Sequence, residues 1–152
     1  MALKEMTQRF TPMLYVRSSM DAVEFYRNVF GVEEIEERTM LLSQVPGMDG
    51  IPGADRTVVY SKLQFADGSG LNVAELSDEG VYAKDGGAVV GNNIHVGLQH
   101  TEPAVQKAEF DKLAEDGTVL EKLEEKFWGT QFGIVRDRFG VIWESNCYLR
   151  QG

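Results

Sequence analysis

The stretch FWGTQFGIVRDRFGVIWESN, from Phe127 to Asn146, decides the fold of this chain. Its last residues alternate as a half-buried strand does, and the segment RDRFG before them is typical of a turn between two strands. One carboxylate, Glu144, follows Trp143 inside this otherwise apolar strand. Because burying an isolated carboxylate is costly, Glu144 must face solvent, pair with a charge or bind a cation.

The same order of elements occurs twice along the chain. In each half one strand precedes a helix, and three strands follow it. The expected strands are residues 11–16, 33–43, 57–65 and 71–76 in the first half, and 94–99, 118–123, 131–137 and 141–149 in the second. The pattern is an internal duplication of a βαβββ unit, and the fold class is α+β.

Helix boundary signals support this order. Ser18 with Asp21 fits a capping box before the first helix, and Gly31 ends that helix. In the second half Pro103 lies in the first turn, and the expected apolar face consists of Ala104, Val105, Ala108 and Leu113.

The duplication divides the chain into two modules of one domain, residues 10–150. Module 1 spans residues 10–76, a linker spans 77–93, and module 2 spans 94–150. The loop at 45–56 is rich in glycine and proline, so it is neither a strand nor a helix interior.

Composition restricts the partners. The chain of 152 residues has 15 Lys and Arg against 24 Asp and Glu, a formal charge of -9. Such a surface repels nucleic acid and anionic membranes, and no apolar run reaches the ~18 residues of a membrane helix. The single cysteine, Cys147, allows no internal disulfide. We therefore expect a cytoplasmic protein that binds neither nucleic acid nor membrane.

Alternation along three strands indicates which side chains face a ligand. Ile94, Val96 and Leu98 are expected to face the core. The opposite faces carry Thr11, Met13 and Tyr15, then His95, Gly97 and Gln99, and finally Ile142, Glu144, Asn146 and Tyr148. These faces mix polar and aromatic groups, as expected for a ligand cleft, and Trp128 is a candidate for its mouth.

The segments TPMLYV, AVEFYRNVFG, NNIHVGL and FWGTQFGIVRDRFGVIWESN, arranged in a duplicated βαβββ unit, resemble the vicinal oxygen chelate superfamily, which has the glyoxalase and bleomycin-resistance fold. The PhnB-like branch is the best match, and the resemblance extends over residues 10–148. It implies two curled mixed sheets that form a cleft, commonly in a homodimer. In the superfamily's enzymes, the first and last strands of each half supply the ligands of a divalent metal.

This resemblance assigns roles to individual residues. The ligand positions of the second half correspond to His95 and Glu144, and the position on the first strand corresponds to Thr11, whose hydroxyl is not a usual ligand of a catalytic metal. The fourth position falls on Glu75 or, with a slip of one residue, on Ala74. The candidate metal ligands are therefore His95, Glu144 and Glu75, with Glu144 also the candidate for moving a proton. The candidate ligand-binding residues are Thr11, Met13, Tyr15, Gln99, Trp128 and Asn146.

Two hypotheses follow. The first is a binding protein that holds a small molecule without a complete set of metal ligands and has no cofactor. The alternative is a lyase, isomerase or dioxygenase that uses one divalent metal ion (Zn, Ni, Mn or Fe) on a small oxygenated substrate.

Overall fold

The computed structural model describes residues 9–149, which form two compact units separated between Ala88 and Val89. The first unit contains β1 (Met13–Val16), α2 (Ser19–Phe30), β2 (Glu33–Leu41), the 3-10 turns η1 (Leu42–Gln44) and η2 (Ala54–Arg56), β3 (Val58–Gln64), β4 (Gly70–Glu75) and the short helix α3 (Val81–Lys84). The second contains β5 (Val96–His100), α4 (Pro103–Leu113), β6 (Thr118–Glu125), β7 (Thr130–Arg136) and β8 (Ile142–Tyr148). The duplicated βαβββ order and the α+β class are confirmed.

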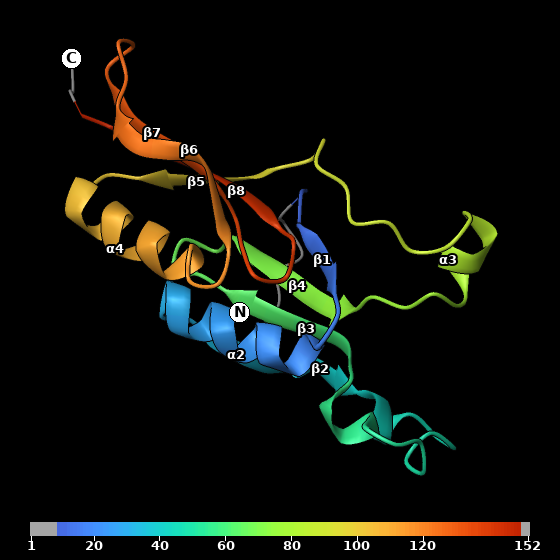
Figure 1. The fold of residues 1–152 in the computed structure, drawn as a ribbon. Helices are drawn as coiled ribbons and strands as arrows, with labels where there is room; N and C mark the ends of the chain where they lie inside the picture. Colours follow the sequence, from blue (N-terminus) through green and yellow to red (C-terminus); the bar gives the residue numbers. More distant parts are fainter. Residues whose placement is uncertain (1–8, 150–152) are drawn as a thin grey trace. The chain divides into compact units, whose positions relative to one another are not determined.

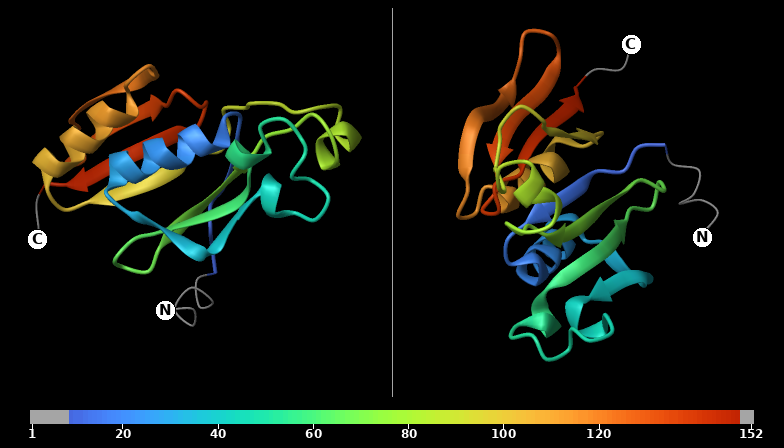
Figure 2. Two further views of the ribbon diagram at one scale, coloured as in Figure 1. Left: turned by 90° about the horizontal axis from the view of Figure 1, so that it is seen from below. Right: turned by 90° about the vertical axis from the view of Figure 1, so that its right-hand side faces the viewer.

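Each unit has one four-stranded mixed sheet, with the order β1-β4-β3-β2 in the first and β5-β8-β7-β6 in the second (Figure 1). In both sheets the first strand runs parallel to the last, and the other neighbours are antiparallel. Helix α2 covers one face of the first sheet and α4 one face of the second (Figure 2). We call the face of each sheet opposite its helix the distal face. The boundary between the units falls inside the predicted linker, and the grouping of both modules into one domain stays a prediction.

Helix α2 packs through a narrow stripe of small and aromatic side chains. Ala22, Val23 and Tyr26 are almost fully buried, and Gly31 ends the helix with a φ of 64° while its N–H donates to the Arg27 carbonyl. The predicted capping box at Ser18 is wrong, because Ser18 has a left-handed backbone and its side chain makes no capping hydrogen bond. The carboxylate of Glu75 takes that role, accepting from the Ser19 backbone N–H at 3.1 Å and the Ser19 hydroxyl at 2.6 Å.

Helix α4 packs through only one residue of its predicted apolar face, Leu113. Ala104, Val105 and Ala108 are exposed, and the buried positions are Gln106, Phe110 and Leu113. Gln106 is fully buried because its amide donates to the Gln131 carbonyl and to the Ser145 hydroxyl, both at 3.0 Å. A satisfied polar side chain thus takes a core position that hydrophobicity alone does not reveal.

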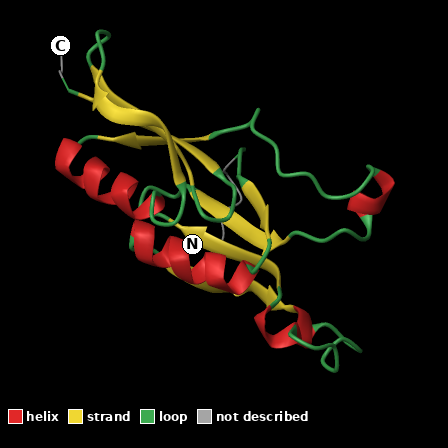
Figure 3. Cartoon of the chain, in the orientation of Figure 1, coloured by secondary structure: helices red, strands yellow, loops and turns green. Residues whose placement is uncertain are grey.

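The segments that were expected to be irregular contain only short helical turns (Figure 3). The loop at 45–56 ends in η2, where Ala54 is buried and the Arg56 guanidinium donates to Asp21 at 2.7 Å. In the segment after β4, Tyr82 of α3 packs edge-on against Tyr15 with ring centroids 6.0 Å apart. Across residues 9–149, no helix has both the length and the apolar character needed to cross a membrane.

Candidate functional site

The distal face of the second sheet brings together most of the predicted site residues of that half. The register pairs Gly97 with Glu144 and Gln99 with Asn146, and it places Ile134 and Phe132 of β7 beside these two β8 residues. The opposite face of β8 carries Trp143, Ser145 and Cys147, all buried. The predicted facing of Glu144 and Asn146 is therefore confirmed. Two residues differ from the predicted facing. Ile94, expected in the core, precedes β5 and is 82% exposed, and Ile142, expected on the ligand face, is buried.

His95 and Glu144 form the central pair of this face. His95 Nδ1 lies 2.8 Å from Glu144 Oε1, and His95 Nε2 lies 2.9 Å from the Asn92 carbonyl oxygen. Both oxygens are hydrogen-bond acceptors, so the imidazolium form, which donates from both nitrogens, satisfies both contacts at once. The bond to Glu144, followed by the bond to Asn92, raises the pKa of His95 above its ordinary value, and desolvation opposes this shift.

Amide and aromatic groups extend the face on either side of this pair. Asn146 Nδ2 donates to Gln99 Oε1 at 3.1 Å. The Asn146 carbonyl oxygen and the Gln99 NH₂ group take no part in this hydrogen bond. Trp128, in the turn between β6 and β7, lies edge-on to Phe132 with ring centroids 5.9 Å apart. Phe127 lies edge-on to Trp128 in the same turn and is 98% exposed. The second sheet thus combines a charged pair, two amides and an aromatic patch.

The first sheet repeats this framework with different side chains. The hairpin turn begins at Phe65 in the first unit and at Asp137 in the second. Three residues later each turn has a glycine with a φ of 94°, Gly68 or Gly140. Both glycine N–H groups donate at 3.0 Å to the first residue of the turn, Phe65 or Asp137. From these turns, β3 with β4 follows the same register as β7 with β8. Asn72 therefore occupies the position of Glu144, and Lys62 that of Ile134.

The alignment of the two halves that the sequence suggested is wrong, because it matched a different glycine of the first hairpin to Gly140. It aligned Gly70 with Gly140 and so placed the fourth ligand position on Glu75 or Ala74. The structural equivalent of Gly140 is Gly68, and the equivalent position is Asn72. Ala74 lies beside Tyr15 on the distal face, whereas Glu75 pairs with Val16 and contacts α2. The metal-binding role assigned to Glu75 stays a prediction.

Counting back along the first strands gives the remaining equivalence. Met13 pairs with Asn72 as Gly97 pairs with Glu144, so Thr11 corresponds to His95. Met13 and Tyr15 are each 46% exposed on the distal face of β1, as predicted, and Thr11 lies just before this strand. The first sheet therefore has a hydroxyl and an amide where the second has an imidazole and a carboxylate.

The side chains at the four ligand positions differ in how well they bind the divalent metal that the resemblance implies. A metal ligand must offer a lone pair, but both His95 nitrogens face oxygen acceptors. Thr11 and Asn72 are poor ligands for zinc or a similar ion. Within residues 9–149, no group of three or more His, Cys, Asp or Glu side chains is arranged to hold a metal ion.

Comparison with known proteins identifies the family. The model of the Glyoxalase/Bleomycin resistance protein/Dioxygenase superfamily matches residues 9–145. This chain belongs to that superfamily. The expected family is therefore confirmed, and its solved neighbours include a PhnB protein and a glyoxalase-family enzyme.

Several relatives within the superfamily cover nearly the whole chain. Protein YjdN of Escherichia coli is 26% identical over 138 residues, which is 86% of this chain and 88% of YjdN. Protein PA1353 from Pseudomonas aeruginosa has a TM-score of 0.72 with 21% identity, covering 93% of this chain and 98% of PA1353. The PhnB protein from Bacillus cereus has a TM-score of 0.66 with 19% identity, covering 92% and 99%. These structures share the glyoxalase fold with this chain.

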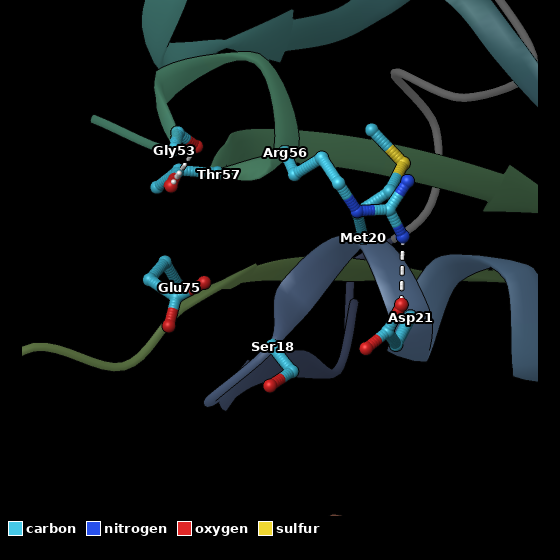
Figure 4. A pocket seen from close by; sticks show the side chains of 7 residues that line it. All are labelled: Ser18, Met20, Asp21, Gly53, Arg56, Thr57 and Glu75. Atoms are coloured by element: carbon cyan, nitrogen blue, oxygen red, sulfur yellow. Dashed lines mark hydrogen bonds and ion pairs between the residues drawn. The ribbon is translucent and has the colours of Figure 1, made fainter. Parts of the chain in front are cut away.

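A cavity of about 390 Å³ in the first unit is lined in part by Glu75. Figure 4 shows its carboxylate facing a space that Ser18, Met20, Asp21, Gly53, Arg56 and Thr57 also line. The guanidinium of Arg56 reaches Asp21 at 2.7 Å and Glu24 at 3.3 Å, and these bonds raise the pKa of Arg56. Because Arg56 and Asp21 pair with each other, the cavity holds an internally neutralised cation rather than one that awaits a ligand.

Sequence reasoning missed three residues of the two distal faces, namely Lys62, Asn72 and Phe132. The sequence offers two glycines for this alignment, and only the positive φ in the structure shows that Gly68 matches Gly140. This alignment pairs Lys62 with Ile134 and Asn72 with Glu144. Phe132 then corresponds to Tyr60, an aromatic position present in both halves.

Proposed function

We propose that this glyoxalase-superfamily chain binds a small organic molecule on the distal face of its second sheet without a complete set of metal ligands. The observation that carries the proposal is the engagement of both His95 nitrogens, with Glu144 Oε1 at 2.8 Å and the Asn92 carbonyl at 2.9 Å. An imidazole held between two acceptors serves as a hydrogen-bond donor and a cation, not as a metal ligand.

The groups around this pair define the ligand chemistry. Among residues 9–149, the Gln99 NH₂ group and the Asn146 carbonyl oxygen have no hydrogen-bond partner beyond this pair, which suits a ligand with both donors and acceptors. Trp128 and Phe132 offer aromatic surface, which favours a planar or apolar part in the same molecule. A small molecule with one flat apolar side and a polar edge fits this combination.

The alternative is a metal-dependent lyase, isomerase or dioxygenase. It requires that His95 release one of its two oxygen partners and turn that nitrogen toward a metal shared with Glu144. It also predicts a bound metal ion in stoichiometric amount, whereas the proposed binding protein contains none.

Tryptophan fluorescence tests the binding proposal. Trp128 is 53% exposed and Trp143 is fully buried, so a ligand on this face changes the emission of Trp128 alone. We expect hits from a library of aromatic and hydroxylated fragments to change the emission of the wild type, and to lose at least about tenfold in affinity in Asn146→Ala. Trp128→Phe should abolish the signal, whereas His95→Ala should change the affinity by less than about threefold.

Elemental analysis separates the two functions. We expect protein purified without chelator to contain no stoichiometric metal, and added Zn, Ni, Mn or Fe(II) to leave its melting temperature unchanged. One metal ion per chain that disappears in His95→Ala would support the enzyme. The expected homodimer stays a prediction, which light scattering at micromolar concentration checks.

A further inference from the structure

Lys62, on β3 of the first sheet, is a largely buried lysine whose side chain pairs with no carboxylate among residues 9–149. Its residue is 8% exposed, and within residues 9–149 the structure gives its ammonium group no hydrogen bond and no ion pair. Lys126 of the second unit shows the usual solution, because its side chain is 14% exposed and reaches Glu121 at 2.6 Å and Glu124 at 3.2 Å. The ammonium group of Lys62 has no such carboxylate, so it is available to a ligand.

The fold itself does not need a lysine here. Ile134 occupies the same register position in the second sheet, so an apolar side chain satisfies the packing of this framework. The lysine is instead accommodated by Gly70, since a Cβ atom at Gly70 would lie 3.2 Å from Lys62 Cε as well as against the Leu63 carbonyl. The cation at this position therefore has to be explained by something other than packing.

Asn72, which pairs with Lys62 across β3 and β4, is the second incomplete group. Its Oδ1 atom is buried and has no hydrogen-bond partner in the described part of the chain. Buried polar atoms are nearly always paired, so the unpaired Oδ1 of Asn72, opposite a lysine without a carboxylate, indicates a missing ligand. Met13, on the other side of Asn72, supplies apolar surface beside the two groups.

We propose that Lys62 and Asn72 form a binding site for a small oxyanion on the distal face of the first sheet. The ammonium group of Lys62 binds the carboxylate or phosphate oxygens, and Asn72 Oδ1 accepts from a hydroxyl group next to them. A 2-hydroxycarboxylate and a phosphate monoester share this chemistry. The site goes beyond the function proposed above, because none of its residues belongs to the second unit.

Thermal denaturation at constant ionic strength tests this site, with sodium glycolate and sodium phosphate as probes and sodium chloride as the control. We expect at least one probe to raise the melting temperature of the wild type saturably, by roughly 3–6 °C when its concentration far exceeds the dissociation constant. A response to glycolate alone assigns the site to hydroxycarboxylates, and a response to phosphate alone assigns it to phosphate groups. No saturable rise with either probe overturns the proposal.

Variants locate the effect. Lys62→Met should lower the shift in melting temperature to less than about 1 °C. Lys112→Met, at an exposed position of α4, should keep the full shift. Asn72→Asp retains the lysine and places a carboxylate opposite it, so it should also abolish the response even if Lys62→Met does not fold. His95→Ala should keep the response, which separates this site from the one on the second sheet. An undiminished shift in Lys62→Met, or in Asn72→Asp, would contradict the proposal.

Discussion

The distal faces of the two sheets have the same backbone register and opposite chemistry. The first sheet places a lysine, Lys62, opposite the amide of Asn72, and the second places Ile134 opposite the carboxylate of Glu144. His95 hydrogen-bonds Glu144 in the second unit, where the first has Thr11 at the corresponding position. Since one framework tolerates both sets, the charged residues are not required by the fold. The charged residues of each unit are therefore evidence about the ligand that this unit binds.

The two hairpin turns extend this comparison to stability and give the largest expected effect. Asp137 is 2% exposed; its Oδ1 accepts from the Phe139 and Val141 N–H groups, and its Oδ2 from the Trp143 indole at 2.9 Å. Asp137→Ala leaves a buried indole N–H without this acceptor, so we expect a loss of about 2–4 kcal/mol in the free energy of unfolding. Urea denaturation measures this loss.

Asp67, an aspartate in the turn of the first hairpin, is the control at an exposed site, and its counterpart in the second turn is Phe139. It accepts from the Ser69 N–H at 2.9 Å and from the Ser69 hydroxyl at 2.6 Å at an exposed site. Asp67→Ala should cost only about 0.5–1 kcal/mol, since water replaces these bonds. Equal losses in the two variants would show that burial of the acceptor does not set the difference between the turns.

The sequence predicted the framework better than the site because strands and helices have local signals. Alternation and glycine positions placed every strand of the duplication to within a few residues. Asn72 was missed because two glycines, Gly68 and Gly70, compete in one turn, and only the backbone φ and the hydrogen bonds distinguish them. Gln106 was missed because a buried amide is recognised by its partners, which are distant in sequence.

The helix contacts of the two sheets differ as well, with a moderate expected effect. Glu75 of β4 binds the first residue of α2, and its equivalent in β8, Cys147, is a buried thiol. Glu75→Ala removes a charged acceptor from the N-terminus of α2, so we expect a loss of about 1–2 kcal/mol in the free energy of unfolding. Circular dichroism during urea denaturation provides the measurement.

Ser18→Ala is the control for this cap, because the Ser18 side chain makes no capping hydrogen bond. We expect it to change the free energy of unfolding by less than about 0.5 kcal/mol. A larger loss in Ser18→Ala than in Glu75→Ala would restore the capping box that the sequence suggested.

The smallest effect concerns the charge of the pair in the second sheet. The folded protein raises the pKa of His95 above 6.5, mainly through the hydrogen bond to Glu144. The stabilisation from this pair is therefore complete below about pH 6.5, the unfolded-state value, and is lost as the pH rises through the higher folded-state pKa. Glu144→Gln removes the charged acceptor, so NMR titration should show the pKa of His95 shifted down toward 6.5. The accompanying loss of stability should be larger at pH 6 than at pH 9. If Glu144→Gln leaves the titration of His95 unchanged, the two side chains are not paired in solution, and the observation that carries the proposed function fails with them.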